Sequence, residues 1–130
     1  MKQRSSDKRA REVDVPQFAD SRGRLAAFER LRPLPFTPVR TFVISDVPPG
    51  EHRAQHVTRC SEFLLMAAGS CRAIVRPREK CGAEDEQQFR LTVHGRGLYI
   101  PQNVWIDLCD FTASGVLICV ADAEYAGTCG

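Results

Sequence analysis

Residues 50–69 read GEHRAQHVTRCSEFLLMAAG, and the spacing within this stretch indicates the fold more than any other part of the chain. Gly50 is followed after five residues by His56, Thr58 comes two positions later, and Glu62 follows after three more residues. Side chains alternate between the two faces of a β-strand, so positions 56 and 58 are expected to project to one face. We expect Glu62 to return to that face from the neighbouring strand. The stretch therefore predicts two strands that line the interior of a β-barrel.

Short β-rich segments separated by proline and glycine turns make up the chain after its basic N-terminus. Arg72-Ala73-Ile74-Val75-Arg76 alternates polar and apolar residues, as a half-buried strand does. About eight to ten such segments occur at regular spacing without a convincing long helix, a pattern typical of an all-β sandwich or barrel. The segments that predict strands most clearly are 25–28, 39–45, 63–68, 72–76, 89–93, 98–100 and 116–121.

The composition suits one soluble domain, since the chain has 130 residues, of which 43% are hydrophobic. We expect residues 1–14 to be a flexible basic tail and residues 15–130 to form the barrel domain. No aromatic residue interleaves the positive charges of the tail, and the net charge is only +2, so we expect no nucleic-acid partner. The sequence has neither an apolar run of the roughly 20 residues that span a membrane nor the apolar core of a secretory signal. We therefore expect a cytoplasmic protein without a membrane partner.

The stretch 50–69 resembles the first motif of the cupins, G-x5-H-x-H-x3-E-x6-G, in every spacing, with Thr58 in place of the second histidine. The second cupin motif, G-x5-P-x-G-x2-H-x3-N, leaves a trace in Gly95 and Pro101, whereas Ile106 stands at its histidine. In metal cupins these positions hold a metal ion. Because isoleucine cannot bind a metal and threonine is a poor ligand, we expect neither a metal nor another cofactor here. The resemblance implies a small jelly-roll β-barrel of the cupin type.

Several further segments follow one another in a recognisable order. They are Asp20-Ser21-Arg22-Gly23-Arg24-Leu25, Arg40 to Pro48, Arg53-Ala54-Gln55-His56-Val57-Thr58, Gly97 to Trp105, Asp110-Phe111 and Ala121 to Tyr125. In this order they resemble the dTDP-4-keto-6-deoxyglucose 3,4-ketoisomerases, the FdtA/QdtA or WxcM-like family. The resemblance covers nearly the whole chain after residue 15. Members of this family carry a His-x-His pair, and Thr58 replaces its second histidine here.

The resemblance implies a metal-independent isomerase of bacterial deoxysugar biosynthesis. In the family, one imidazole removes the proton from C3 of a dTDP-linked 4-keto-6-deoxyhexose, and reprotonation at C4 moves the ketone to C3. This chemistry needs a base with a pKa near neutrality, which implies His56 as a catalytic residue. Thr58, at the second catalytic position, could relay a proton but could not remove one unaided. Glu62, Tyr99 or His52 are candidates to supply the missing acid–base group.

Five residues are candidates for binding the substrate, and each has a structural alternative. Arg53 either holds a diphosphate or sugar oxygen or lies at the surface. Glu62, in an apolar strand, is either a pocket residue or one half of a buried ion pair. Tyr99 and Trp105 line the pocket or pack in the core. Asp107 lies two residues after Trp105, so their side chains share one face if both residues lie on one strand. Asp107 then reaches the pocket if Trp105 does.

Two other functions fit the same residues. One is a non-catalytic or chemically diverged cupin that binds a nucleotide sugar or another small ligand, with Thr58 marking the lost activity. The other is a metal-dependent cupin oxygenase. The family resemblance further implies a homodimer in which sheet edges are shared between subunits.

Overall fold

The computed structural model describes residues 9–27, 34–78, 85–93 and 96–124, and the regular elements of these residues are β-strands. In this part of the chain no helix is long and apolar enough to cross a membrane. The strands are β1 (Arg11–Val13), β2 (Gln17–Asp20), β3 (Gly23–Ala26), β4 (Arg40–Ser45), β5 (Arg53–Val57), β6 (Glu62–Ala68), β7 (Ser70–Pro77), β8 (Gln87–Thr92), β9 (Gly97–Ile100), β10 (Val104–Cys109) and β11 (Val116–Ala121).

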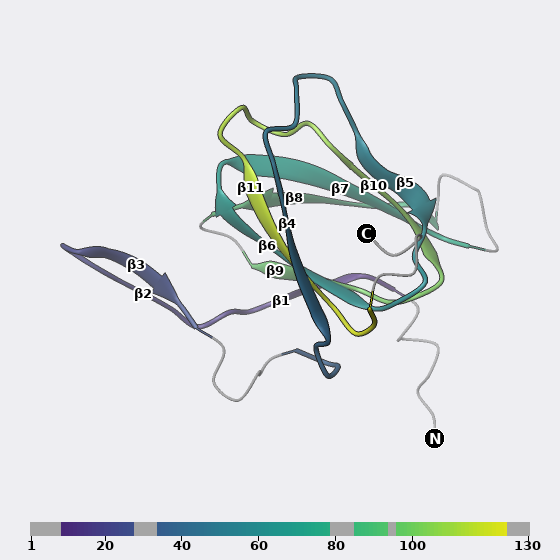
Figure 1. The fold of residues 1–130 in the computed structure, drawn as a ribbon, viewed down its shortest axis with the longest axis horizontal. Coiled ribbons are helices and arrows are strands. Elements are labelled where there is room, and N and C mark those ends of the chain that lie inside the picture. The colour runs from purple at the N-terminus through teal and green to yellow at the C-terminus, as the bar shows by residue number, and fades with distance from the viewer. Residues whose placement is uncertain (1–8, 28–33, 79–84, 94–95, 125–130) are drawn as a thin grey trace.

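Two antiparallel sheets pack face to face and form the barrel (Figure 1). The larger sheet has the strand order β1-β9-β6-β11-β4, and the smaller one has the order β5-β10-β7-β8. The hairpin β2–β3 forms a separate two-stranded sheet that extends away from the barrel in Figure 1. The expected all-β jelly-roll barrel of the cupin type is therefore confirmed.

The inner faces of the two sheets share one apolar core, because alternate residues of β4 and of β6 to β11 point between the sheets. Leu64 of β6, Val75 of β7, Ile106 of β10 and Leu117 of β11 are each at most 1% exposed. Burying a side chain of this size contributes about 1.5–3 kcal/mol. The core therefore fixes the register of the strands, since a slip by one residue would turn these side chains out to solvent.

A second apolar cluster lies on the outer face of the five-stranded sheet. Val13, Val15 and Phe63 are buried there, and Phe36 and Tyr99 pack against them. Val13, Val15 and Phe36 thus cover part of the face that points away from the core.

The barrel begins earlier than the expected boundary at residue 15. Ala10 is only 3% exposed, and its backbone N–H and C=O both bond to the side-chain amide of Gln87. Arg11, the first residue of β1, pairs with Tyr99 of β9, and its guanidinium carbon lies 5.1 Å from the centre of the Tyr99 ring. Residues 10–14 therefore belong to the barrel domain rather than to a tail, and residues 1–8 lie outside the described residues.

Candidate active site

A small cavity lies between the two sheets, lined by β4 and β5, which are edge strands of the two sheets, and by β6, β10 and β11. His56 of β5 and Glu62 of β6 both line it, and the rest of its wall is apolar except for Cys119. The structure thus brings together the histidine and the carboxylate of the first sequence motif. They come from two different sheets, because β5 belongs to the four-stranded sheet and β6 to the five-stranded one.

A bulge in β5 sets the direction of His56. The pairing of β5 with β10 shifts register, so that His56 lies opposite Ile106 while Asp107 lies opposite Ala54, and Gln55 is left without a partner residue. Ala54 and Gln55 both have positive φ values, 71° and 60°, which cost non-glycine residues energy. Bulges of this kind often occur next to active sites, where they re-aim a side chain. Here the bulge keeps the half-buried imidazole on the inner face.

The carboxyl group of Glu62 is suited to proton transfer near neutral pH. The residue is only 4% exposed, and burial raises its pKa from 4.5 to about 7. The positive charge of Arg40 opposes this rise and the negative charge of Asp122 adds to it, both less strongly than burial. A carboxyl group with such a pKa is present in both protonation states at pH 7 and can donate as well as accept a proton.

Two arginines add positive charge at the cavity. Burial raises the pKa of the Cys119 thiol well above its usual value, and the Glu62 carboxylate raises it further, whereas Arg40 and Arg53 lower it. Both guanidinium groups are therefore close enough to influence the interior electrostatically. Arg53 was expected from the sequence and Arg40 was not. Arg40 could have been identified from the alternation of β4, which places it on the same face as the cavity residue Phe42.

Thr58 holds two segments of the backbone together and does not line the cavity between the sheets. Its side chain is fully buried, and its hydroxyl lies 3.0 Å from the carbonyl oxygen of Pro101 and 3.2 Å from that of Val104. The hydroxyl also accepts the N–H of Val104 at 3.2 Å. β5 ends at Val57, but its pairing with β10 continues by one residue, since the N–H of Thr58 bonds to the carbonyl oxygen of Val104. Thr58 and His56 both line a second pocket, so the structure brings the two motif residues together there.

Tyr99 lies on the outer face of the five-stranded sheet, away from the cavity. Its ring is 6.3 Å from that of Phe36, centre to centre, within the outer apolar cluster. Its neighbours in β9, Leu98 and Ile100, point into the core instead. Tyr99 is therefore a packing residue in this chain, which was one of the two interpretations of the sequence.

Trp105 and Asp107 share one face of β10, as expected, but it is the outer face. The neighbouring Ile106 and Leu108 occupy the inner face and line the cavity. The guanidinium carbon of Arg76 lies 4.6 Å from the ring centre of Trp105. The prediction that Trp105 and Asp107 reach the pocket is therefore not met by this arrangement of β10.

Comparison with known proteins gives one consistent picture. Residues 8–128 match the family model described as FdtA, WxcM-like, C-terminal. The TDP-4-oxo-6-deoxy-alpha-D-glucose-3,4-oxoisomerase of Aneurinibacillus thermoaerophilus is 30% identical to the chain over 117 residues, which cover 89% of this chain and 81% of that relative.

Two solved structures are similar over most of their length. The WlaRB TDP-quinovose 3,4-ketoisomerase of Campylobacter jejuni has a TM-score of 0.80 and 27% identity, with 93% of this chain and 91% of that chain covered. A mutant of the 3,4-ketoisomerase QdtA from Thermoanaerobacterium thermosaccharolyticum, in complex with TDP-4-keto-6-deoxyglucose, has a TM-score of 0.79 and 25% identity. That likeness covers 92% of this chain and 83% of the QdtA chain.

Proposed function

This chain belongs to the FdtA family of WxcM-like C-terminal domains, and on this premise we propose that it is a 3,4-ketoisomerase of a TDP-linked 4-keto-6-deoxyhexose. The observation that carries the proposal is the meeting of His56 and Glu62 in one cavity between the sheets. The relative from Aneurinibacillus and the QdtA complex support the nucleotide sugar as substrate, because both names contain a TDP-linked 4-keto-6-deoxyglucose.

The reaction has to move two protons. One leaves C3 of the sugar and returns at C4, and the other leaves the hydroxyl oxygen on C3 and ends on the former carbonyl oxygen at C4. We assign the proton on carbon to His56, because an imidazole with a half-buried ring can accept it near neutral pH and return it to the neighbouring carbon. The intermediate between the two steps is an enediolate.

We assign the proton on oxygen to Glu62. Three other groups could replace the second family histidine, and their positions argue against each of them. The hydroxyl of Thr58 is bonded to the backbone, and Tyr99 packs on the outer face of its sheet. His52 is bonded to a carboxylate on the outer face of β10. Glu62 shares the cavity with His56, and its raised pKa suits a group that gives one proton and takes another.

In this mechanism side chains transfer both protons, and no metal ion takes part. Two of the positions that hold the ion in metal cupins carry Thr58 and Ile106, and neither offers a good ligand. We therefore propose a metal-independent reaction. Arg53 is proposed to bind the diphosphate of the substrate, since its side chain is exposed while its charge still acts on the cavity.

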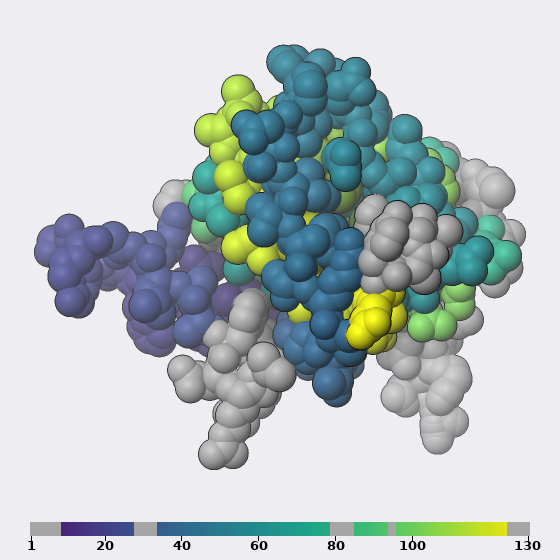
Figure 2. All heavy atoms as spheres, viewed as in Figure 1, coloured from purple at the N-terminus to yellow at the C-terminus, as the bar shows by residue number. Residues whose placement is uncertain are grey.

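We also propose that the protein is a homodimer formed through the hairpin β2–β3. Figure 2 shows this hairpin projecting from the body of the molecule. Phe18 of β2 and Leu25 of β3 are 64% and 58% exposed, an unusual exposure for large apolar residues. A pocket between the hairpin and the outer face of the larger sheet, lined by Phe63 and Ile118 among others, offers an apolar surface nearby. A second copy of the chain would cover these side chains.

The test is incubation of the purified protein with TDP-4-keto-6-deoxyglucose, followed by NMR detection of the 3-keto sugar. The product should form with the wild type and with Thr41→Ala, a control on the outer face of β4, and the rate should fall about 10²–10⁴-fold in His56→Ala. A folded wild-type protein that binds the nucleotide sugar without forming product would instead support the non-catalytic binding function.

A further inference from the structure

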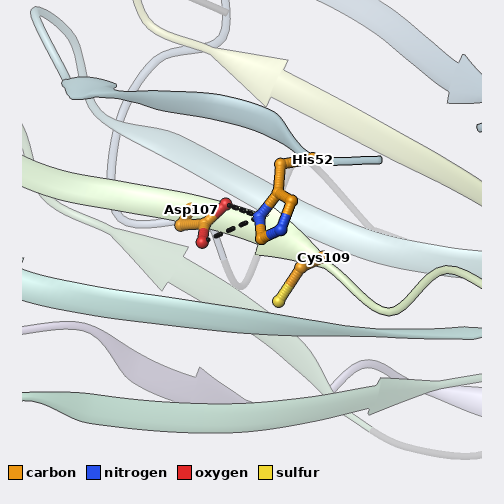
Figure 3. Close-up of side chains that lie close together, drawn as sticks. All are labelled: His52, Asp107 and Cys109. Carbon is orange, nitrogen blue, oxygen red and sulfur yellow. Dashed lines mark hydrogen bonds and ion pairs between the residues drawn. The ribbon is translucent and has the colours of Figure 1, made fainter. Parts of the chain in front are cut away.

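Three side chains with metal-binding atoms meet on the outer face of the four-stranded sheet (Figure 3). Asp107 and Cys109 are alternate residues of β10, and His52 precedes β5. The Nδ1 atom of His52 lies 2.8 Å from Oδ1 and 3.0 Å from Oδ2 of Asp107. One ligand atom from each residue can be chosen so that all three lie within 4.8 Å of one another. The cluster is separate from the cavity, which is lined by the inner face of β10.

The cluster is buried on one side and open on the other. The side chain of Asp107 is 7% exposed and Cys109 is 6% exposed, although both belong to the outer face of the sheet. A buried carboxylate is costly unless it is paired, and the side chain that pairs with Asp107, His52, is itself 42% exposed. A bound cation would offset the negative charge of the buried Asp107 carboxylate.

The donor set matches zinc better than other common metals. Imidazole nitrogen, carboxylate oxygen and thiolate sulfur are the three ligand types that Zn²⁺ accepts, whereas Mg²⁺ and Ca²⁺ prefer oxygen alone. Zinc bonds of about 2.0–2.3 Å place tetrahedral ligands roughly 3.3–3.7 Å apart. The most distant ligand atoms therefore need to approach by at most about 1.5 Å. Rotation of the half-exposed His52 side chain can supply this movement, and water can fill the fourth position from the solvent side.

The positive charge of Arg72 is offset in part by an ion pair. Arg72 of β7 pairs with Cys109 across the sheet, and its guanidinium Nε lies 3.0 Å from Oδ2 of Asp110. Arg53 follows His52 directly in the chain, but its side chain is exposed to solvent, which screens its charge.

We propose that His52, Asp107 and Cys109 together bind one Zn²⁺ ion. The ion would fasten the segment that precedes β5 to the middle of the four-stranded sheet, and so would hold the strand that carries His56. It plays no part in the proton transfers, because it lies on the opposite face of β10.

The test uses the full chain, treated with a chelator and then titrated with Co²⁺ as a spectroscopic substitute for zinc. We expect one equivalent to bind with a thiolate-to-cobalt absorption band, which Zn²⁺ abolishes by competition. Cys109→Ser should lose the band, and His52→Ala should weaken binding at least about 10–100-fold, the loss typical of removing even an outer partner of a metal ligand. Asp14→Asn, which removes an exposed carboxylate away from the cluster, is the matched control and should bind as the wild type does.

Absence of saturable binding, or an unchanged band in Cys109→Ser, would overturn the zinc site. His52→Ala is the decisive variant where Cys109→Ser fails to fold, since His52 is partly exposed, and undiminished affinity in that variant would equally exclude the site. No substrate is present in this experiment, so its outcome does not depend on the proposed isomerase activity.

Discussion

At the scale of single residues, the buried carboxyl group of Glu62 makes the stability of the fold depend on pH. Its pKa is about 7 in the folded protein and 4.5 as an exposed group, so the folded state keeps its proton to higher pH than the unfolded state does. Below pH 4.5 the Glu62 carboxyl group is protonated in both the folded and the unfolded state, so the free energy of unfolding is not reduced. Stability falls as the pH rises from 4.5 to 7, by about 3 kcal/mol in total, and stays reduced above pH 7.

Replacing Glu62 by glutamine removes this dependence, because the amide does not ionise. Urea unfolding at pH 4.5, 6 and 8 should show the free energy of unfolding of the wild type falling by up to about 3 kcal/mol relative to Glu62→Gln. Equal pH dependence in the two proteins would show that the carboxyl group is not protonated preferentially in the fold.

Substitution of Thr58 is expected to lower the free energy of unfolding while leaving the reaction rate nearly unchanged. Thr58→Val keeps the shape but removes the hydroxyl that contacts Pro101 and Val104, which should cost about 1–3 kcal/mol. Thr58→Ser keeps the hydroxyl and should be close to the wild type. Denaturant unfolding measures the first effect, and the rate per folded molecule measures the second. A fall of 100-fold or more in the rate of folded Thr58→Val would return Thr58 to the catalytic machinery.

At the scale of the elements, the two faces of β10 explain which parts of the site could be predicted. Strand alternation correctly places Trp105 and Asp107 on one face, but a central strand that is buried on both sides carries no sequence signal of which face is inner. His56 and Glu62 were identified because the motif spacing fixes both at once. The bulge in β5 and the contacts of the Thr58 hydroxyl with the backbone have no short-range sequence signature, so neither could be predicted. The barrel itself was predictable from the spacing of strands and turns.

The pairing of β6 with β9 yields a packing prediction. A Cβ atom added at Gly97 would overlap the ring of Phe63, which is 1% exposed. Gly97→Ala should therefore lower the free energy of unfolding by about 1–3 kcal/mol, whereas Ser114→Ala in an exposed turn should leave it nearly unchanged. The midpoint of urea unfolding measures both, and an unaltered midpoint for Gly97→Ala would mean that the two strands are farther apart than described.

At the scale of the whole molecule, the protruding hairpin β2–β3 predicts the oligomeric state. Phe18→Glu should shift the protein from dimer to monomer at micromolar concentration, because the charge would be buried in the proposed interface. Ala113→Glu, in the turn between β10 and β11, should leave the dimer intact. Light scattering coupled to gel filtration distinguishes the two masses. A wild-type monomer, or a Phe18→Glu dimer as stable as the wild type, would show that the hairpin does not form the interface.

The division of the two protons between His56 and Glu62 is the central claim, and deuterium exchange tests it most directly. The measurement is NMR of TDP-4-keto-6-deoxyglucose in deuterated water with each variant. His56→Ala should lose both exchange at C3 and product formation. Glu62→Gln should still exchange the C3 proton, because His56 remains, while product formation falls about 10²–10⁴-fold. Exchange and product formation that both persist in His56→Ala, or a product rate in Glu62→Gln equal to the wild type, would contradict this division of roles.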